Sequence, residues 1–428
     1  MTVAAPFDTS MRHRLGRAVI TVRDASGQPL ADRTVHVEQK RHAFAFGNIG
    51  FDFIDLANGD DDLEPSATSA FGRASAGNLD RLADLWLDLF TTATLPFYWS
   101  GFEPRPGHTD TRRMLRAARW FADRGVALKG HPLVWHTLAP DWLLELSLDE
   151  VERAQRRRVR REVSDFAGLI DTWDVINEAV IMPVFDRQAN AITDLSRDLG
   201  RIPMIRLAVE EARAANPVAT LLINDFDLGS AFEVLIEAVL EAGIPIDGIG
   251  LQTHMHQGYR GEDAIGEILD RFARYELPLH LTETTILSGD LMPPHIEDLN
   301  DYRVDSWPST EEGEQRQADE IVRHYRSLVA HPAVASITYW GFTDEGAWLG
   351  APVGLVRADG TPKPSYRALR SLLREEWWLG PTTVRTDRLG QVAVEAFAGE
   401  FEVRVRGQLV NVQLRAGETS SLDLVIES

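Results

Sequence analysis

Two stretches of the chain end on a carboxylate directly after a strand-like apolar run. Residues 171–178 read DTWDVINE and residues 277–283 read LPLHLTE, so the runs end on Glu178 and Glu283. The first run is rich in Trp, Val and Ile, a pattern that is typical of a buried parallel strand. Such a strand is expected to end on polar residues only where its end opens into a cleft. We therefore predict that Glu178 and Glu283 face each other across one site.

Other polar and aromatic residues fall where further predicted strands end. Two carboxylates, side-chain amides, imidazoles and indoles together suit the cleavage of a glycosidic bond. In that reaction one carboxylic acid protonates the leaving oxygen, while the other carboxylate attacks the sugar or activates water. A single carboxylate at a strand end is as readily explained by an ordinary salt bridge, but two of them among this polar set favour a catalytic site. The set comprises His131, Trp135, His136, Asn177, Asn224, Asp225, Gln252, His254, His256 and Trp340.

Strands and helices alternate along most of the chain, and this alternation brings distant strand ends together. Eight strand–helix units predict a parallel sheet, and they fit a closed (β/α)8 TIM barrel, of class α/β, better than an open sheet. No glycine-rich phosphate loop follows the first strand, as an open dinucleotide-binding fold would require. Strands are predicted within residues 41–54 and at 90–97, 127–136, 171–178, 219–227, 246–256, 277–283 and 335–344. Helices are predicted at 79–89, 109–125, 148–170, about 197–214, 230–243, 262–275, 311–331 and 365–378.

Both ends of the chain differ in pattern from this barrel. Residues 14–38 alternate apolar and polar residues around a turn, which predicts a β-hairpin. Residues 381–428 form short alternating runs separated by Gly turns, which predicts a small β unit. Neither piece can bury its apolar face alone, so we expect the two to pair as an accessory unit. The predicted domains are the hairpin at 1–40, the catalytic barrel at 41–380 and the small β unit at 381–428.

Two segments between the predicted elements are expected to be loops. The acidic stretch at 58–69 has the composition of a surface loop. A second loop, of about 25 residues, follows the strand at 277–283 and is long enough to be functional.

The composition restricts the partners that this protein can have. The formal net charge is −21, from 44 basic and 65 acidic residues, so no basic excess exists to neutralise the phosphates of nucleic acid or of an anionic membrane. The chain has no Cys, which excludes disulfides and thiolate metal ligands. It contains neither a run of about 18 apolar residues nor the apolar region of a secretory signal. We therefore expect a cytoplasmic protein, or a secreted one if a signal peptide has been removed.

Six segments resemble, in order, the strand-end motifs of glycoside hydrolase family 10, the retaining β-xylanase family. They are GHPLVWH, WDVINEA, LLINDFD, GIGLQTH, LHLTE and ITYWGFTDEGAWL, and the resemblance covers roughly residues 40–376. It implies that Glu178 is the acid/base and Glu283 the nucleophile of a double displacement on β-1,4-xylan or xylo-oligosaccharides. It also implies a carbohydrate substrate, with no cofactor and no metal. The implied binding residues are His131 and Trp135 around the cleaved sugar, Asn177 at its 2-hydroxyl, Gln252 and His254 beside the nucleophile, and Trp340 and Trp348 as walls.

The chain departs from the family pattern at two places. After its second strand the family has a segment resembling ENxMKWE, which supplies polar groups to the sugar next to the cleavage point. Here that stretch is TLPFYWSGFEP at 94–104, in which only Trp99 matches clearly and Tyr98 stands where a polar group is expected. The family's TELD is TETT, with Thr285 in place of Asp. We therefore expect a short or apolar cleft on this side, and another small or non-xylan β-glycoside is the alternative substrate.

Two other functions are compatible with parts of the sequence. His254 and His256 alternate on one strand and point to one side, with His131 nearby, as in a metal-dependent barrel hydrolase. A metal assay distinguishes this function from a glycosidase. The other is a sugar-binding protein that has lost catalysis, which hydrolysis of an aryl β-glycoside would eliminate. The sequence does not indicate an oligomeric state.

Overall fold

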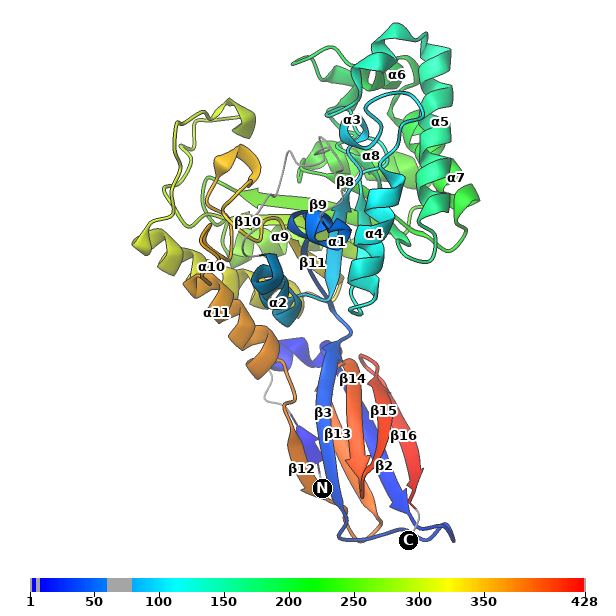
Figure 1. Cartoon of the computed structure of the whole chain (residues 1–428), viewed down its shortest axis with the longest axis vertical. Helices are drawn as coiled ribbons and strands as arrows, with labels where there is room; N and C mark the ends of the chain where they lie inside the picture. Colours follow the sequence, from blue (N-terminus) through cyan, green and yellow to red (C-terminus); the bar gives the residue numbers. More distant parts are fainter. Residues whose placement is uncertain (1, 5–7, 60–78, 427–428) are drawn as a thin grey trace. The chain divides into compact units, whose positions relative to one another are not determined.

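The structure is a computed structural model that describes residues 2–4, 8–59 and 79–426 (Figure 1). Most of the acidic loop expected at 58–69 lies outside these described residues. The chain divides into two compact units, which are described one at a time below. One comprises Met1–Ala45, Ile321–Pro332 and Ser365–Ser428, and the other comprises Phe46–Glu320 and Ala333–Pro364. The domain limits expected from the sequence, 1–40, 41–380 and 381–428, stay predictions.

The larger unit is built on a closed barrel of eight parallel strands, which confirms the predicted (β/α)8 fold (Figure 1). The strands follow one another round the barrel in chain order, because each β–α–β connection places a strand beside the previous one. Every predicted barrel strand overlaps an observed one. The strands are β4 (Ala45–Ile49), β5 (Thr92–Pro96), β6 (Ala127–His131), β7 (Thr172–Asn177), β8 (Thr220–Asp225), β9 (Gly248–Met255), β10 (Leu279–Ile286) and β11 (Val334–Tyr339).

Helices connect these strands, and one of them differs from the prediction. The helix expected at about 197–214 is two helices, because Gly200 takes a φ of 87° that ends the first. The first of the two is capped by the Asn190 side chain, which accepts the N–H of Thr193 at 2.7 Å. The helices are α1 (Ile54–Asn58), α2 (Leu79–Leu89), α3 (Trp99–Phe102), α4 (Thr111–Ala122), α5 (Leu148–Asp165), α6 (Ala191–Leu199), α7 (Arg201–Ala215), α8 (Ser230–Glu241), α9 (Glu262–Ala273), α10 (Glu311–Ala330) and α11 (Pro364–Ser371).

The smaller unit contains two four-stranded sheets, with strand orders β1-β13-β2-β16 and β12-β3-β14-β15. The N-terminal and C-terminal strands pair as expected, since β2 lies between β13 and β16 while β3 lies between β12 and β14. The predicted hairpin at 14–38 is wrong, because β2 and β3 belong to different sheets. The strands are β1 (Thr2–Ala4), β2 (Leu15–Arg23), β3 (Thr34–His42), β12 (Thr382–Arg385), β13 (Gln391–Phe397), β14 (Gly399–Val405), β15 (Gln408–Leu414) and β16 (Thr419–Val425).

The two sheets of this unit share one apolar core. Ile20 of β2 and Val35 and Val37 of β3 are fully or almost fully buried in it, together with Val394 of β13 and Val403 of β14. Along β3 the buried valines alternate with exposed residues, as expected of a strand with one face on a core. Each sheet therefore depends on the other for the cover of its apolar face.

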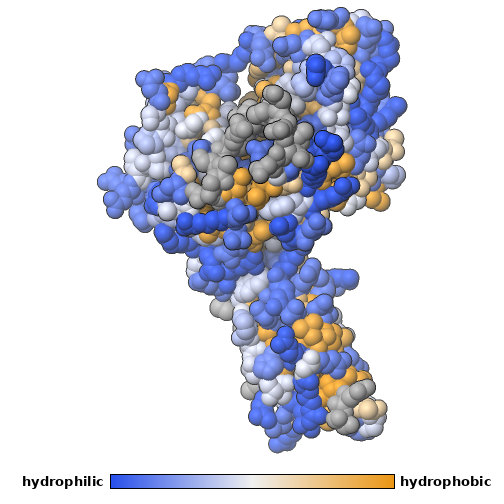
Figure 2. Space-filling view, viewed as in Figure 1, coloured by the Kyte–Doolittle hydropathy of each residue, from blue (hydrophilic) through white to orange (hydrophobic). Residues whose placement is uncertain are grey.

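On the face shown in Figure 2, hydrophobic residues lie in small groups among hydrophilic ones, as on most protein surfaces. Within the described part of the chain, no helix is both long enough and apolar enough to cross a membrane.

Deletion of residues 381–428 is expected to reduce the soluble yield more than the specific activity. The deletion removes β12 to β16 and uncovers the apolar faces that carry Ile20, Val35 and Val37. Strands exposed in this way pair with other copies and aggregate. The measurement is the amount of soluble protein, with the specific activity of the soluble fraction as its control. An unchanged yield would show that the N-terminal strands do not need these partners.

Candidate active site

Glu178 and Glu283 lie at the same end of the barrel. Glu178 directly follows β7, and Glu283 lies in β10, opposite Gln252 of β9. Strands β7 to β10 run parallel, so their carboxyl ends open on one face. Glu178 has a φ of 57°, a left-handed conformation that is uncommon for a residue other than glycine and is often found at functional sites. The barrel thus brings together two carboxylates that are far apart in the sequence.

Three side-chain amides link the two carboxylates. Asn224 Nδ2 donates to Asn177 Oδ1 at 2.7 Å and to Glu283 Oε1 at 3.0 Å. Asn177 Nδ2 donates to Glu178 Oε1 at 3.2 Å. Gln252 Nε2 donates to Asn177 Oδ1 at 3.0 Å. All three amides are buried, so this network fixes the two carboxylates relative to each other.

Glu178 is protonated at neutral pH. Its pKa is raised to about 8, first by burial and then by the negative charges of Asp225 and Glu283, against the opposing hydrogen bond from Trp135. Trp135 Nε1 donates to Glu178 Oε2 at 2.8 Å, and His136 Nε2 lies 3.8 Å from the same oxygen. A carboxylic acid that stays neutral in this way can give its proton to a leaving oxygen.

Glu283 is ionised at neutral pH. Burial alone would raise its pKa, but the charge of His131 and the hydrogen bond with His254 outweigh burial and hold the pKa below its ordinary value. His254 Nε2 lies 3.0 Å from Glu283 Oε2, and His131 Nε2 lies 3.8 Å from Oε1. An ionised carboxylate with a fixed orientation suits attack on an anomeric carbon.

Two buried charged residues hold His131 on the side of its ring that faces away from Glu283. Asp174 Oδ2 accepts a hydrogen bond from Lys129 Nζ at 2.5 Å and lies 2.7 Å from His131 Nδ1. This contact with Nδ1 leaves the other ring nitrogen of His131 directed toward Glu283. The sequence prediction did not include Lys129 or Asp174. A charged residue inside each of two buried apolar strands was the available signal, because burying a charge is costly without a partner.

Thr285 stands where the resembling family motif has Asp, and it holds His254. Its hydroxyl lies 3.2 Å from His254 Nδ1 and accepts the N–H of Met255 at 3.3 Å. Because the hydroxyl accepts from Met255, its own proton is free to be donated to Nδ1, which leaves Nε2 of His254 as the donor to Glu283. The Asp-to-Thr difference therefore keeps the histidine in position without a second carboxylate.

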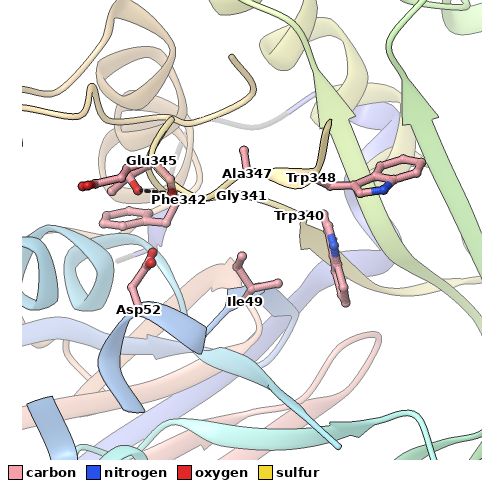
Figure 3. Close-up of a pocket in the computed structure, with 10 residues that line it drawn as sticks. Ile49, Asp52, Trp340, Gly341, Phe342, Glu345, Ala347 and Trp348 are labelled. Carbon is pink, nitrogen blue, oxygen red and sulfur yellow. Dashed lines mark hydrogen bonds between the residues drawn. The ribbon is translucent and has the colours of Figure 1, made fainter. Parts of the chain in front are cut away.

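Trp340 and Trp348 pack against the two histidines that lie beside Glu283. The ring centroids of Trp340 and His131 are 5.1 Å apart, and those of Trp348 and His254 are 5.0 Å apart. Both indoles line a cavity at the carboxyl end of β11, with Asp52 on the opposite side (Figure 3). Asp52 is a lining residue that the sequence prediction missed, because it follows β4 in a segment with no site-like pattern.

The segment at 94–104 supplies an apolar wall where polar groups were expected from the family pattern. Tyr98 is buried in a cluster with Ile49, Phe51 and Trp340. Its ring centroid lies 5.8 Å from that of His131, and the ring centroids of Phe51 and Trp340 are 5.7 Å apart. This side of the site is therefore lined by rings, and it also carries the Tyr98 hydroxyl, whose pKa is raised by burial and by the negative charges of Glu283 and Glu178.

His256, which the sequence grouped with the site, lies beyond His254 rather than at a carboxylate. Its ring centroid is 5.9 Å from that of His254 and 5.2 Å from that of Trp348, and burial lowers its pKa to about 3. Among the described residues, no group of three or more His, Cys, Asp or Glu is arranged to hold a metal ion. One ring nitrogen of His254 is occupied by Glu283 and the other by Thr285.

Known proteins resemble this chain in both sequence and fold. The sequence model of the family described as "Glycosyl hydrolase family 10" matches residues 92–372. Endo-1,4-beta-xylanase B of Thermotoga neapolitana is 29% identical over 294 residues, which cover 65% of this chain and 78% of that protein. Endo-1,4-beta-xylanase of Geobacillus stearothermophilus is 28% identical over 247 residues, which cover 54% of this chain and 69% of that protein.

Solved structures share the fold at lower sequence identity. The crystal structure of xylanase 10B from Thermotoga petrophila RKU-1 in complex with xylobiose has a TM-score of 0.60 and 22% identity, covering 77% of this chain and 94% of that one. A family 10 structure from Paenibacillus barcinonensis has a TM-score of 0.60 and 23% identity, covering 78% and 96%. The family match extends over most of the chain. The barrel of this chain carries one protonated and one ionised carboxyl group at its carboxyl end. This chain therefore belongs to glycosyl hydrolase family 10.

Proposed function

We propose that this protein hydrolyses β-1,4-linked xylosides with retention of configuration, with Glu178 as the acid/base and Glu283 as the nucleophile. The observation that carries the proposal is the opposite protonation of two linked carboxyl groups. The pKa of Glu178 is raised to about 8, whereas the pKa of Glu283 is lowered. A protonated acid beside an ionised carboxylate is what the first step of double displacement requires.

In the first step, a Glu283 oxygen attacks the anomeric carbon of the bound sugar. The bond from that carbon to the leaving oxygen breaks, and Glu178 transfers its proton to this oxygen. The product is a covalent glycosyl ester on Glu283 together with the free alcohol. Asn177 lies between the two carboxylates, where its amide is placed to hold a hydroxyl of the sugar.

In the second step, Glu178 is a carboxylate and acts as a base. It takes a proton from a water molecule, which attacks the anomeric carbon from the side that the leaving group vacated. The ester bond to Glu283 breaks, and the sugar is released with its original configuration. Two inversions at one carbon give net retention.

Xylosides are proposed as substrates because the relatives of this chain are named as xylanases. The experiment is a ranking of initial rates on aryl β-xyloside, β-xylobioside, β-glucoside and β-arabinoside. The two xylosides are expected to rank first. Faster hydrolysis of the β-glucoside or β-arabinoside would show that another sugar is the preferred substrate. The proposed mechanism would be unaffected.

Small substrates are expected to have a high kcat/KM relative to long xylan. Tyr98 lies in the segment where the resembling family has polar groups for the next sugar of a polymer, and its ring packs in a cluster with Phe51 and Trp340. The measurement is kcat/KM on an aryl β-xylobioside and on soluble xylan at equal concentrations of xylose units. A strong preference for polymeric xylan would contradict this expectation.

The pH profile is expected to fall on its alkaline side near pH 8. Glu178 must carry its proton in the first step, and its raised pKa of about 8 means that the proton is lost as the pH rises through that value. Glu283 must be ionised, and its lowered pKa keeps it so until the pH falls below the ordinary carboxyl range. The measurement is kcat/KM of the wild-type protein against pH. An alkaline limb below about pH 6 would contradict a raised pKa at Glu178.

A further inference from the structure

An exposed group of ion pairs joins the loops that follow the two strands bearing the carboxylates. Arg187 Nη1 donates to Asp301 Oδ1 at 2.7 Å and Nη2 donates to Asp301 Oδ2 at 3.1 Å, a bidentate pair. Arg187 Nη2 also lies 2.7 Å from Asp298 Oδ2. Arg187 belongs to the loop between β7 and α6, whereas both aspartates belong to the long loop between β10 and α10. The three residues are called the Arg187 strap below.

The strap connects two places that the barrel itself keeps apart. Strands β8 and β9 lie between β7 and β10 in the barrel. The loop that carries Arg187 begins directly after Glu178, and the loop that carries the aspartates begins shortly after Glu283. A direct contact between these loops therefore spans the carboxyl ends of β8 and β9, which carry Asn224 and Gln252 of the site.

The loop after β7 is fixed to the barrel at its base. Asp225 Oδ2 accepts the N–H of Val180 at 3.1 Å, and Arg201 donates to the carbonyl of Val180 at 2.6 and 3.0 Å. Arg197 Nε donates to the carbonyl of Pro183 at 3.2 Å. These contacts fix the base of the loop that carries Arg187.

The loop after β10 is fixed in the same way. Trp307 is buried and its Nε1 donates to the carbonyl of Asp290 at 2.8 Å. Ser288 is held by Lys363 Nζ at 2.7 Å, and Lys363 is also paired with Asp344. Both loops are thus anchored at their bases. Their tips are joined by charged side chains that are 36–56% exposed.

Another arc of the barrel, at the ends of β4, β5 and β11, carries a buried apolar cluster. Ile49 of β4, Phe51, Tyr98 and Trp340 form a buried cluster there. A polysaccharide must extend past the cleaved bond on both sides, so it needs a groove that is open at both ends. A small glycoside needs only a pocket.

We propose that the Arg187 strap is a specificity determinant that closes one end of the substrate site and disfavours long chains. This inference rests on the proposed xylosidase function, because it concerns which substrates reach Glu178 and Glu283. The strap acts by position and contacts neither carboxylate. Its groups are exposed, so salt weakens it: at about 1 M salt the screening length is only about 3 Å.

The experiment compares kcat/KM on soluble xylan with kcat/KM on an aryl β-xyloside for the wild type and for Arg187→Gln. The variant is expected to raise the xylan value by about two- to fivefold, the range that an exposed ion pair can supply, without changing the aryl xyloside value. Asp298→Asn with Asp301→Asn is expected to have the same effect. High salt should raise the xylan value of the wild type but not that of Arg187→Gln.

Arg274→Gln is the matched control, because Arg274 forms an exposed ion pair with Glu237 of α8, and the variant removes the same charge without touching either loop of the strap. A charge-swapped variant, Arg187→Asp with Asp301→Arg, is expected to restore the wild-type ratio. If the ratio of kcat/KM on xylan to kcat/KM on the aryl β-xyloside is unchanged in Arg187→Gln and in the double aspartate variant, the proposed role of the strap is wrong. Loss of the proposed function is recognised separately, as failure of the wild type to hydrolyse any aryl β-xyloside.

Discussion

Glu283→Ala is expected to abolish turnover of every β-glycoside, by at least about 10⁴-fold in kcat. The variant lacks the carboxylate that His254, His131 and Asn224 hold ready for attack. Because the ester of the proposed mechanism forms on this carboxylate, even substrates with very good leaving groups should fail. Added azide or formate occupies the space of the missing side chain and should restore turnover.

Glu283→Asp is the matched comparison for this variant. It keeps the charge but withdraws the carboxylate from the anomeric carbon by one methylene, so partial activity without rescue by azide is expected. A thermal melt of each variant checks that folding is unaffected. Wild-type rates in Glu283→Ala would show that the nucleophile lies elsewhere.

Glu178→Ala is expected to lose activity to an extent that depends on the leaving group. Loss of general acid catalysis costs about 10²- to 10⁴-fold on substrates whose leaving oxygen needs a proton. Dinitrophenyl glycosides leave without a proton, so the first step should proceed and a glycosyl-enzyme should accumulate. Azide should then speed its breakdown, because azide needs no base to attack.

The measurement is a series of aryl β-xylosides whose phenols differ in acidity, with rates taken for the first and second steps. Wild-type rates should depend weakly on the phenol, and Glu178→Ala rates should depend on it steeply. The alkaline limb near pH 8 should also be absent from the variant with dinitrophenyl substrates, because the group that titrates there is gone. Equal losses on all leaving groups would contradict a role for Glu178 as the acid.

The barrel could be predicted from the sequence because each of its strands and helices has a local signature. A run such as that before Glu178 is buried on both faces and ends at the cleft, whatever its neighbours are. The break at Gly200 between α6 and α7 was missed, because a glycine within a helical pattern is usually tolerated and only its φ of 87° ends the helix. Local pattern therefore gave the elements, with errors at their ends.

Strand partners in the smaller unit could not be predicted in the same way. The pattern of β2 and β3 shows that each has one apolar face, but not which strand lies beside it. The sequence between them favoured a hairpin, yet both are paired with strands that lie more than 340 residues further along the chain. Such pairing is decided by the packing of the whole core rather than by the turn.

The placement of candidate site residues was predictable where a residue ends a strand and less so elsewhere. Asn177, Gln252 and His254 lie in the hydrogen-bonded network around the two carboxylates, and His131 Nε2 lies 3.8 Å from Glu283 Oε1. Lys129 and Asp174 were missed because they lie inside strands, and Arg187 because its partners are more than 100 residues away in another loop. Contacts of this kind exist only after the chain has folded.

The most direct test of the division of roles is the anomeric configuration of the azide product, determined by NMR for each variant. In Glu283→Ala, azide attacks the intact substrate once from the nucleophile's side, so the account predicts an inverted glycosyl azide. In Glu178→Ala, azide attacks the glycosyl-enzyme from the opposite side, so a retained product is predicted. A retained product from Glu283→Ala together with an inverted product from Glu178→Ala would mean that the two carboxylates have each other's role.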